Sequence, residues 1–396
     1  MGKPKIRFKG YEDDWEQRKL DNVAEFSKGR GYSKGDLIEL GTPIILYGRL
    51  YTNYETSISD VDTYVEAKDG SVYSRGGEVI VPASGESAED IARAATVDKS
   101  GILLGGDLNV VMPNEDINSG FLAISISNGN PQRELAKRAQ GKSVVHIHNE
   151  EIRNLRVPFP IKVEQNKIVE YFFNLDHLIT LHQRKCEETK SLKKYMLQKM
   201  FPENGNCVPK IRFSGFADAW EQRKFADMAI RESAVQTASQ EIPGVEYDDV
   251  VVEEGCLNKD ISSKETKKSG ILFDGSQVLY GKLRPYLHNW LNPDFKGVAV
   301  GDWWVLKPID LNKNFLYRLI QTQQFDNIAN QSAGSKMPRA DWNLISNSAF
   351  MVPFSNEEQR KIGDYFLSLD HLITLHQHKC DELQKLKKFM LQNMFV

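Results

Sequence analysis

Lysine, arginine and tyrosine side chains gather in three loop-like stretches whose chemistry suits contact with a phosphate backbone. The stretches read SKGRGYSKG (Ser27–Gly35), GKLRPYLHNW (Gly281–Trp290) and GSKMPRADW (Gly334–Trp342). Cationic groups neutralise phosphates, and polar side chains can also hydrogen-bond to base edges in the DNA grooves. For each loop the alternative is an ordinary solvated surface. The candidate DNA-contacting residues, chosen on physical grounds only, are Arg30, Tyr32, Lys34, Ser84, Lys142, Ser143, Lys282, Arg284, Tyr286, Lys336 and Arg339.

Two His–Cys pairs have a spacing that could serve a metal. His182 and Cys186 are four residues apart, as are His376 and Cys380. Two His and two Cys can ligate zinc if paired helices bring them together. The alternative, which we favour, is a polar layer in a helix–helix seam that fixes its register. We therefore predict no metal. The chain has four cysteines and no CxxC, which favours a reducing cytoplasm over a disulfide framework.

Three short stretches resemble catalytic motifs but lack what those motifs need. AKRAQGKS (Ala136–Ser143) is similar to a phosphate-binding loop, yet a helix-like segment precedes it and a strand-like segment follows, the reverse of the required order. NPDF (Asn292–Phe295) departs from the Asn-Pro-Pro-Phe of adenine methyltransferases, and no glycine-rich cofactor loop accompanies it. HIHN (His146–Asn149) has no acidic cluster beside it, so we interpret its histidines as strand residues. We predict no catalytic residue in this chain.

The elements that must position these residues occur twice. PKIRFKGYEDDWEQRKL (Pro4–Leu20) returns as PKIRFSGFADAWEQRKF (Pro209–Phe225), and LDHLITLHQ occurs both at Leu175–Gln183 and at Leu369–Gln377. The interiors diverge, although AQGKSV (Ala139–Val144) still matches SAGSKM (Ser332–Met337). Two copies are too few for a solenoid, so the chain is a pseudo-two-fold tandem repeat. Similar ends around unlike interiors indicate one task done twice with two specificities.

Each copy of the repeat ends in a long predicted helix. Glu164–Met200 contains no Gly or Pro, and its apolar residues recur three or four positions apart, as they do in the second copy. Such a helix spans about 55 Å and needs a partner to be stable. We expect the two helices to pair as an antiparallel coiled coil; the alternative is that each packs on its own domain. The predicted helix-pairing seam comprises Ile168, Phe172, Leu175, Ile179, His182, Cys186, Ile362, Phe366, Leu369, Ile373, His376 and Cys380.

The interiors predict two globular domains of mixed α and β structure. Short strands are expected at Glu78–Ala83, Leu108–Pro113, Ser143–His148, Ser276–Gly281 and Trp303–Pro308, with short helices near GFLAISISN and FLYRLIQTQ. The expected boundaries are 1–160 and 206–355 for the two domains, with helices at 161–205 and 356–396. The net charge of −3 does not announce a nucleic-acid binder, nor does it exclude one, because the placement of cations matters more than their sum. No stretch is apolar enough to predict a membrane span.

The doubled PKIRF openings and the doubled LDHLITLHQ helices resemble the specificity subunit of type I restriction-modification enzymes, over essentially the whole chain. KLRPYL, ASGESAEDIA and LGGDLNVV are similar to stretches of that family's recognition domains. The resemblance implies two target recognition domains, each reading one half of a split site in double-stranded DNA, with the paired helices as a ruler between them.

The same resemblance implies partners that carry out the chemistry. Two methyltransferase subunits would supply adenine methylation with S-adenosylmethionine, and restriction subunits would complete an endonuclease that uses ATP and Mg. This chain would be non-catalytic and hold no cofactor. The alternative function is a coiled-coil adaptor that binds proteins and no DNA. A titration with random duplex at several salt concentrations separates the two, because affinity for DNA falls linearly with the logarithm of salt concentration.

Overall fold

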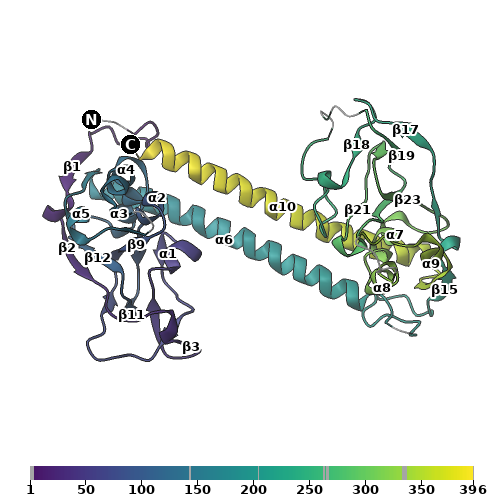
Figure 1. The fold of residues 1–396 in the computed structure, drawn as a ribbon, viewed down its shortest axis with the longest axis horizontal. Helices are drawn as coiled ribbons and strands as arrows, with labels where there is room; N and C mark the ends of the chain where they lie inside the picture. Colours follow the sequence, from purple (N-terminus) through teal and green to yellow (C-terminus); the bar gives the residue numbers. More distant parts are fainter. Residues whose placement is uncertain are drawn as a thin grey trace. The chain divides into compact units, whose positions relative to one another are not determined.

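The structure of the protein is a computed structural model that describes residues 4–141, 144–203, 205–261, 264, 267–331 and 337–395. The chain forms two compact units, which we call unit 1 (Met1–His182 with His378–Val396) and unit 2 (Gln183–Gln377). Both boundaries fall inside long helices, α6 (Lys162–Lys199) and α10 (Asn356–Met394) (Figure 1). Each unit therefore contains part of both helices.

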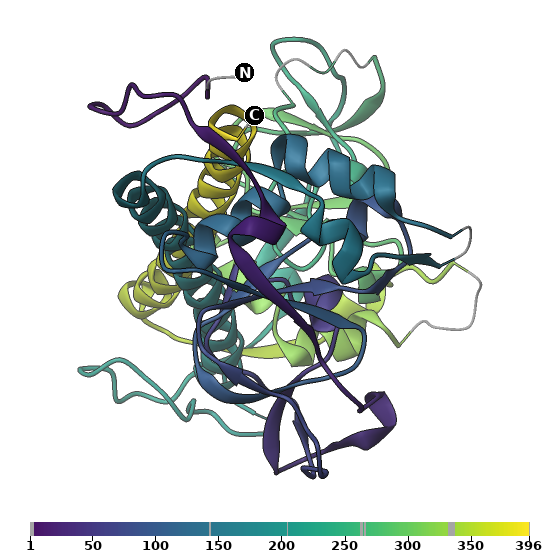
Figure 2. The same ribbon diagram turned by 90° about the vertical axis from the view of Figure 1, so that its left-hand side faces the viewer.

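Unit 1 is built on two five-stranded sheets (Figure 2). One has the order β2 (Ala24–Lys28), β12 (Leu108–Pro113), β8 (Glu78–Pro82), β10 (Ala95–Val97), β5 (Ser57–Ile58). The other has the order β3 (Leu37–Ile38), β6 (Tyr64–Val65), β4 (Thr42–Ile45), β11 (Ser100–Leu104), β7 (Tyr73–Arg75). Two strand pairs join distant segments: β1 (Glu16–Lys19) with β14 (Arg156–Phe159), and β9 (Ser84–Gly85) with β13 (Val145–His146). The short helices are α1 (Arg49–Thr52), α2 (Ala88–Ile91), α3 (Ser119–Ile126), α4 (Gly129–Arg138) and α5 (Asn149–Arg153), with 3-10 turns η1 (Leu20–Asn22) and η2 (Lys34–Asp36).

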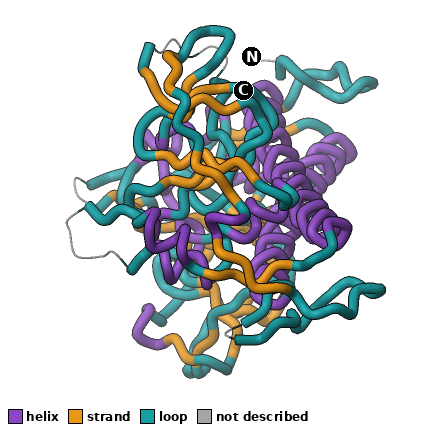
Figure 3. Tube along the Cα trace, turned by 90° about the vertical axis from the view of Figure 1, so that its right-hand side faces the viewer, coloured by secondary structure: helices purple, strands orange, loops and turns teal. Residues whose placement is uncertain are grey.

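Unit 2 repeats this plan with two four-stranded sheets (Figure 3). Their orders are β16 (Ala229–Arg231), β23 (Trp303–Pro308), β20 (Val278–Gly281), β21 (Trp290–Leu291), and β17 (Val235–Thr237), β19 (Ser269–Phe273), β22 (Gly297–Ala299), β18 (Gly244–Val245). β15 (Glu221–Lys224) pairs with β24 (Ala349–Val352), as β1 does with β14. The short helices are α7 (Lys313–Leu319), α8 (Gln323–Ala329) and α9 (Trp342–Asn347), with 3-10 turns η3 (Phe225–Asp227), η4 (Tyr247–Asp249) and η5 (Pro285–Leu287).

Several of the short elements predicted from the sequence are deeply buried. β8 is buried along its whole length, which explains why EVIVP lacks the polar alternation of a half-exposed strand. The strands predicted around β12, β20 and β23 and the helices α3 and α7 are confirmed. The strand expected over Ser143–His148 is shorter, because only Val145 and His146 pair, with Gly85 and Ser84.

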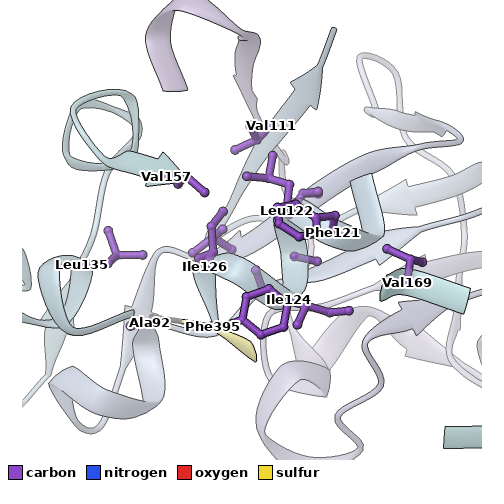
Figure 4. Packing of buried hydrophobic residues seen from close by; sticks show 14 of the residues in the cluster. Ala92, Val111, Phe121, Leu122, Ile124, Ile126, Leu135, Val157, Val169 and Phe395 are labelled. Carbon is purple, nitrogen blue, oxygen red and sulfur yellow. The ribbon is translucent and has the colours of Figure 1, made fainter. Parts of the chain in front are cut away.

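An aromatic cluster lies within the core of each unit, and each cluster includes a phenylalanine that follows a long helix. In unit 1 the Phe395 ring lies 5.7 Å from that of Phe121, and Figure 4 shows both rings. The Phe395 ring also lies 6.2 Å from that of Trp15. In unit 2 the Phe201 ring lies 5.9 Å from that of Trp220 and 5.4 Å from that of Phe315. Phe201 follows α6, which begins in unit 1, whereas Phe395 follows α10, which begins in unit 2. Each core is thus completed by a segment from the other half of the repeat.

The two long helices pack against each other in antiparallel directions inside each unit. In unit 1 Asp176 of α6 accepts a 2.5 Å bond from Lys387 of α10, and in unit 2 Asp370 of α10 forms a 2.6 Å ion pair with Lys193 of α6. These are equivalent residues of the repeat. The Cys186 thiol also lies 4.0 Å from the carbonyl oxygen of Ile373. The predicted antiparallel pair is confirmed.

The predicted seam residues are buried or half-buried, and they pack in two ways. Leu175 and Ile179 belong to the same apolar cluster as Cys380 and Leu383 of the opposite helix. The residues nearer the start of each helix, Ile168 and Phe172 in unit 1 and Ile362 and Phe366 in unit 2, are buried in the globular core of their own unit. His182 and His376 are half-buried. Both modes of packing considered from the sequence therefore occur, at different points along each helix.

Candidate nucleic-acid interface

Unit 2 brings two of the predicted basic loops together where its central strand β20 ends and the antiparallel β23 begins. The amide of Lys282 donates to the carbonyl of Asp302 at 2.9 Å, and the amide of Ala340 donates to the carbonyl of Lys282 at 2.8 Å. Leu283 and Arg339 form an isolated antiparallel bridge. The amide of Arg284 donates to the carbonyl of Pro338 at 2.7 Å. Two segments more than fifty residues apart thus share one edge.

The cations at this edge are held by one carboxylate. Asp302 accepts from the guanidinium of Arg339 at 3.3 and 3.1 Å, and its oxygen lies 3.5 Å from the ammonium of Lys282. Burial opposes ionisation of Asp302, but its hydrogen bond with Arg339 and the two positive charges lower its pKa overall. The hydrogen bond with Asp302 likewise raises the pKa of Arg339, which is exposed. Arg339 therefore stays charged at the surface.

The KLRPYL loop is held in an unusual backbone conformation. Arg284 and His288 flank η5 with positive φ angles of 50° and 54°, a region that residues with a side chain rarely adopt. His288 is fixed by Glu253 and Asp326, at 3.2 and 3.0 Å from its two ring nitrogens. Arg284 and Tyr286 are exposed, the latter by 52%. Strain of this kind gathers at functional sites.

Unit 1 has the same edge with different side chains. Ser84, the one sequence candidate there that the structure describes, pairs with His146, and its hydroxyl lies 3.2 Å from Nδ1 of that histidine. The ring of His146 is stacked against that of His148, with centroids 6.4 Å apart, and both histidines are exposed.

The remaining candidates of unit 1 lie in the loop after β2. Arg30 and Lys34 are exposed there. Tyr32 has a φ of 61°. Its hydroxyl accepts a hydrogen bond from the amide of Lys68 at 2.7 Å and is also hydrogen-bonded to the hydroxyl of Ser71, so the side chain stabilises the loop. The ammonium of Lys68 lies 4.9 Å from the Tyr32 ring centroid. The phenol is thus engaged within the loop. Lys142, Ser143 and Lys336 lie outside the described residues.

Sequence reasoning missed three residues of the interface: His146 and Asp302 at the two edges, and Lys68 beside Tyr32. The match between AQGKSV and SAGSKM carried the missing signal, because its register, continued by a few residues, pairs His146 with Arg339. The aspartate and the lysine gave none, since their importance comes from side chains that are distant in sequence.

The described residues hold no group of three or more His, Cys, Asp or Glu side chains that could bind a metal. Within the same residues, no helix is long and apolar enough to cross a membrane. The order of elements around AKRAQGKS also differs from that of a phosphate-binding loop, because α4 runs into the start of that stretch and β13 follows it.

Comparison with known proteins gives this architecture a family. The model of the "Type I restriction modification DNA specificity domain" matches residues 12–191 and 218–385, one segment for each copy of the repeat. The chain belongs to this family. It is similar to the type I restriction enzyme MjaVIII specificity subunit of Methanocaldococcus jannaschii, with 20% identity, over 95% of this chain and 91% of that protein. Its fold is that of the type I restriction-modification S subunit from M. genitalium, with a TM-score of 0.66, 14% identity, and coverage of 100% of this chain and 99% of the other.

Membership confirms the resemblance found in the sequence: the chain is a type I restriction-modification specificity subunit, and the adaptor function is not favoured. The two matched segments agree with the two-unit architecture, the mixed sheets and the two long helices.

Proposed function

We propose that this specificity subunit reads a split site in double-stranded DNA, with unit 1 on one half and unit 2 on the other, while partner subunits carry out all catalysis. One observation carries the proposal: the two units share a main-chain framework and differ in the polar side chains that it displays. If both units read the same half-site sequence, their polar side chains would not need to differ. The exposed cations Arg30, Lys34, Arg284 and Arg339 supply the charge that phosphate contact requires.

The helix pair would set the distance between the two half-sites. α6 and α10 run without interruption through 38 and 39 residues, and each begins in one unit and ends in the other. A helix of this length spans about 57 Å, which is enough to serve half-sites roughly one turn of DNA apart, 34–36 Å.

A matched pair of apolar patches supports two identical protein partners. In unit 1 the patch consists of Leu178, Leu386 and Phe389, which are 40%, 41% and 53% exposed. In unit 2 the equivalent residues Leu372, Leu192 and Tyr195 are 42%, 44% and 51% exposed. Clustered exposed apolar groups mark protein interaction sites.

Within each unit, the two leucines of the patch flank the helix pair on one side. Leu178 precedes the buried Ile179, and Leu372 precedes the buried Ile373. Leu192 and Leu386 precede Lys193 and Lys387. These two lysines lie one heptad after the seam residues Cys186 and Cys380. Residues that precede seam positions flank an antiparallel pair on the same side. We assign one methyltransferase subunit to each patch, with restriction subunits completing the endonuclease; S-adenosylmethionine, ATP and Mg would be held by those partners.

DNA binding is tested with the complex reconstituted from this chain and its methyltransferase subunits. We expect affinity for duplex to fall linearly with the logarithm of salt concentration, and Arg284→Ala to weaken it while thermal unfolding is unchanged. Lys296→Ala is the matched control, since Lys296 is exposed at the opposite end of β22 from Asp302. A wild-type complex that binds no duplex at low salt would refute the proposal in favour of the adaptor.

Stoichiometry is tested by native mass spectrometry of the same complex. Leu178→Asp or Leu372→Asp alone should remove one methyltransferase subunit, and the double variant both, because each change buries a charge in one patch. Thr180→Asp is the control: Thr180 is exposed two residues on, about 200° around the helix. Two methyltransferase subunits retained by the double variant would move docking to another surface.

A further inference from the structure

In each unit, one central strand ends where its antiparallel neighbour begins: β8 beside β12 in unit 1, and β20 beside β23 in unit 2. The main chain just beyond this point, which we call the edge, has the same hydrogen bonds in both units. In unit 1 the amide of Ala83 donates to the carbonyl of Asp107 at 2.8 Å, and that of Ile147 donates to the carbonyl of Ala83 at 3.1 Å. In unit 2 the corresponding bonds join Lys282 to Asp302 at 2.9 Å and Ala340 to Lys282 at 2.8 Å. The strand registers agree, since Pro82 faces Leu108 as Gly281 faces Trp303. Ser84 and His146 therefore occupy the positions of Leu283 and Arg339.

A half-buried tyrosine fixes the edge in each unit. The hydroxyl of Tyr51 donates to the carbonyl of Ser84 at 2.8 Å. The hydroxyl of Tyr247 donates to the carbonyl of Asp302 at 2.6 Å and accepts from the amide of Leu283 at 3.1 Å. Burial raises the pKa of both phenols, so they remain protonated donors.

Each edge also has a glycine beside its tyrosine. A Cβ atom on Gly85 would lie 2.8 Å from the Tyr51 hydroxyl, and one on Gly281 would lie 3.0 Å from that of Tyr247. The main chain is therefore packed closely against a rigid ring in both units. A fixed backbone of this kind holds its surface side chains in a defined geometry.

The side chains on this shared frame differ in hydrogen-bonding chemistry. Unit 1 presents the hydroxyl of Ser84 and the stacked imidazoles of His146 and His148, which can donate or accept. Unit 2 presents the guanidinium groups of Arg284 and Arg339, which only donate. Arginine binds guanine O6 and N7 with both arms of its fork, a contact that serine and histidine cannot reproduce. Contacts to phosphate alone would not need this contrast.

We propose that these two edges are the base-reading elements of the protein: Ser84 and His146 discriminate bases in one half-site, and Arg284 and Arg339 read guanine in the other. The inference rests on the proposed function and adds the residues and the chemistry of each half. It predicts that the two halves of the methylated motif can be changed independently, each from its own unit.

The test maps N6-methyladenine genome-wide in cells that carry the complete system with one variant of this chain at a time. His146→Ala or Ser84→Ala should relax the bases accepted in one half of the motif only, and Arg284→Ala or Arg339→Ala in the other half only. Discrimination at the affected position should fall about tenfold or more. Arg339→Lys keeps the charge and loses the fork, so it should relax the motif as Arg339→Ala does.

The controls are Arg133→Ala on α4 in unit 1 and Lys296→Ala in unit 2, both exposed, which should leave the motif unchanged. An unchanged motif in all five edge variants, even with weaker binding, would overturn the inference, because these residues would then contact phosphates only. So would a variant that relaxes both halves. Neither result touches the proposed function, which fails instead if the wild-type system methylates no split motif.

Discussion

The Lys68–Asp36 ion pair is the contact that closes the basic loop of unit 1. Lys68 packs over the Tyr32 ring, and Asp36 is the last residue of η2. Ser33 caps the start of the same turn. The hydrogen bond with Lys68, followed by those from Ser33, lowers the pKa of Asp36 to about 2. The geometry of Arg30, Tyr32 and Lys34 thus depends on a half-buried carboxylate staying ionised.

Acid should remove the stability that the Lys68–Asp36 ion pair contributes. An unfolded aspartate has a pKa of about 3.9, so the lowered folded value means that ionised Asp36 stabilises the fold fully above about pH 4. That contribution is lost as the pH falls from about 4 toward 2. Asp36→Asn should therefore unfold more easily than wild type at neutral pH, with the difference disappearing near pH 2. The measurement is thermal unfolding of both proteins across this range; a difference independent of pH would contradict the assignment.

The residues of the interface show how far sequence reasoning reaches at this scale. Arg284, Tyr286 and Arg339 could be nominated because loops rich in Arg and Tyr suit nucleic acid, and the structure brings these loops to one edge. That Tyr32 is engaged with Lys68 could not be predicted, because the contact spans 36 residues without any local signal. Which residues touch DNA stays a prediction.

Each long helix packs into a globular unit near its start and pairs with the other helix in its middle, and its sequence indicates both roles. Glu164 near the start of α6 is fully buried and accepts two 2.7 Å bonds from Arg7, as Glu358 of α10 accepts bonds of 2.6 and 2.8 Å from Arg212. Their middle parts pair with each other through the heptad seam. The repeat of nearly identical sequence made the helices and their antiparallel pairing predictable. The aromatic residues at their ends were not assigned to a core from the sequence, because no periodicity indicates which unit they enter.

Removing the phenylalanine ring that follows one long helix should destabilise only the unit whose core it completes. Phe395→Ala removes a ring that lies 5.7 Å from Phe121 and 6.0 Å from Phe172, and loss of a buried phenylalanine costs about 3–5 kcal/mol. Hydrogen exchange should therefore accelerate in the peptides of unit 1 and stay unchanged in those of unit 2. Phe389→Ala on the same helix, where the ring is 53% exposed, serves as the control. Equal acceleration in both units would show that they unfold as one.

At the scale of the whole molecule, the pseudo-symmetry explains what the sequence could and could not predict. The repeated ends implied two units, two helices and a family, all of which hold. The strand order inside each unit was not predicted, because strands of two to six residues pair across long separations with little local pattern. The equivalence of His146 and Arg339 emerges only from the hydrogen-bond register.

The proposed ruler gives the final prediction. Seven residues inserted at the middle of both α6 and α10 preserve the heptad seam and lengthen each helix by about 10.5 Å. With a rise of about 3.4 Å per base pair, the methylated motif should keep both half-sites and gain about three base pairs between them. The same insertion in α6 alone shifts one helix past the other by two turns, so the Asp176–Lys387 and Lys193–Asp370 pairs cannot both form. That variant should lose stability and methylation together. An unchanged spacer in the double insertion would mean that the helices do not set the distance, and that another subunit does.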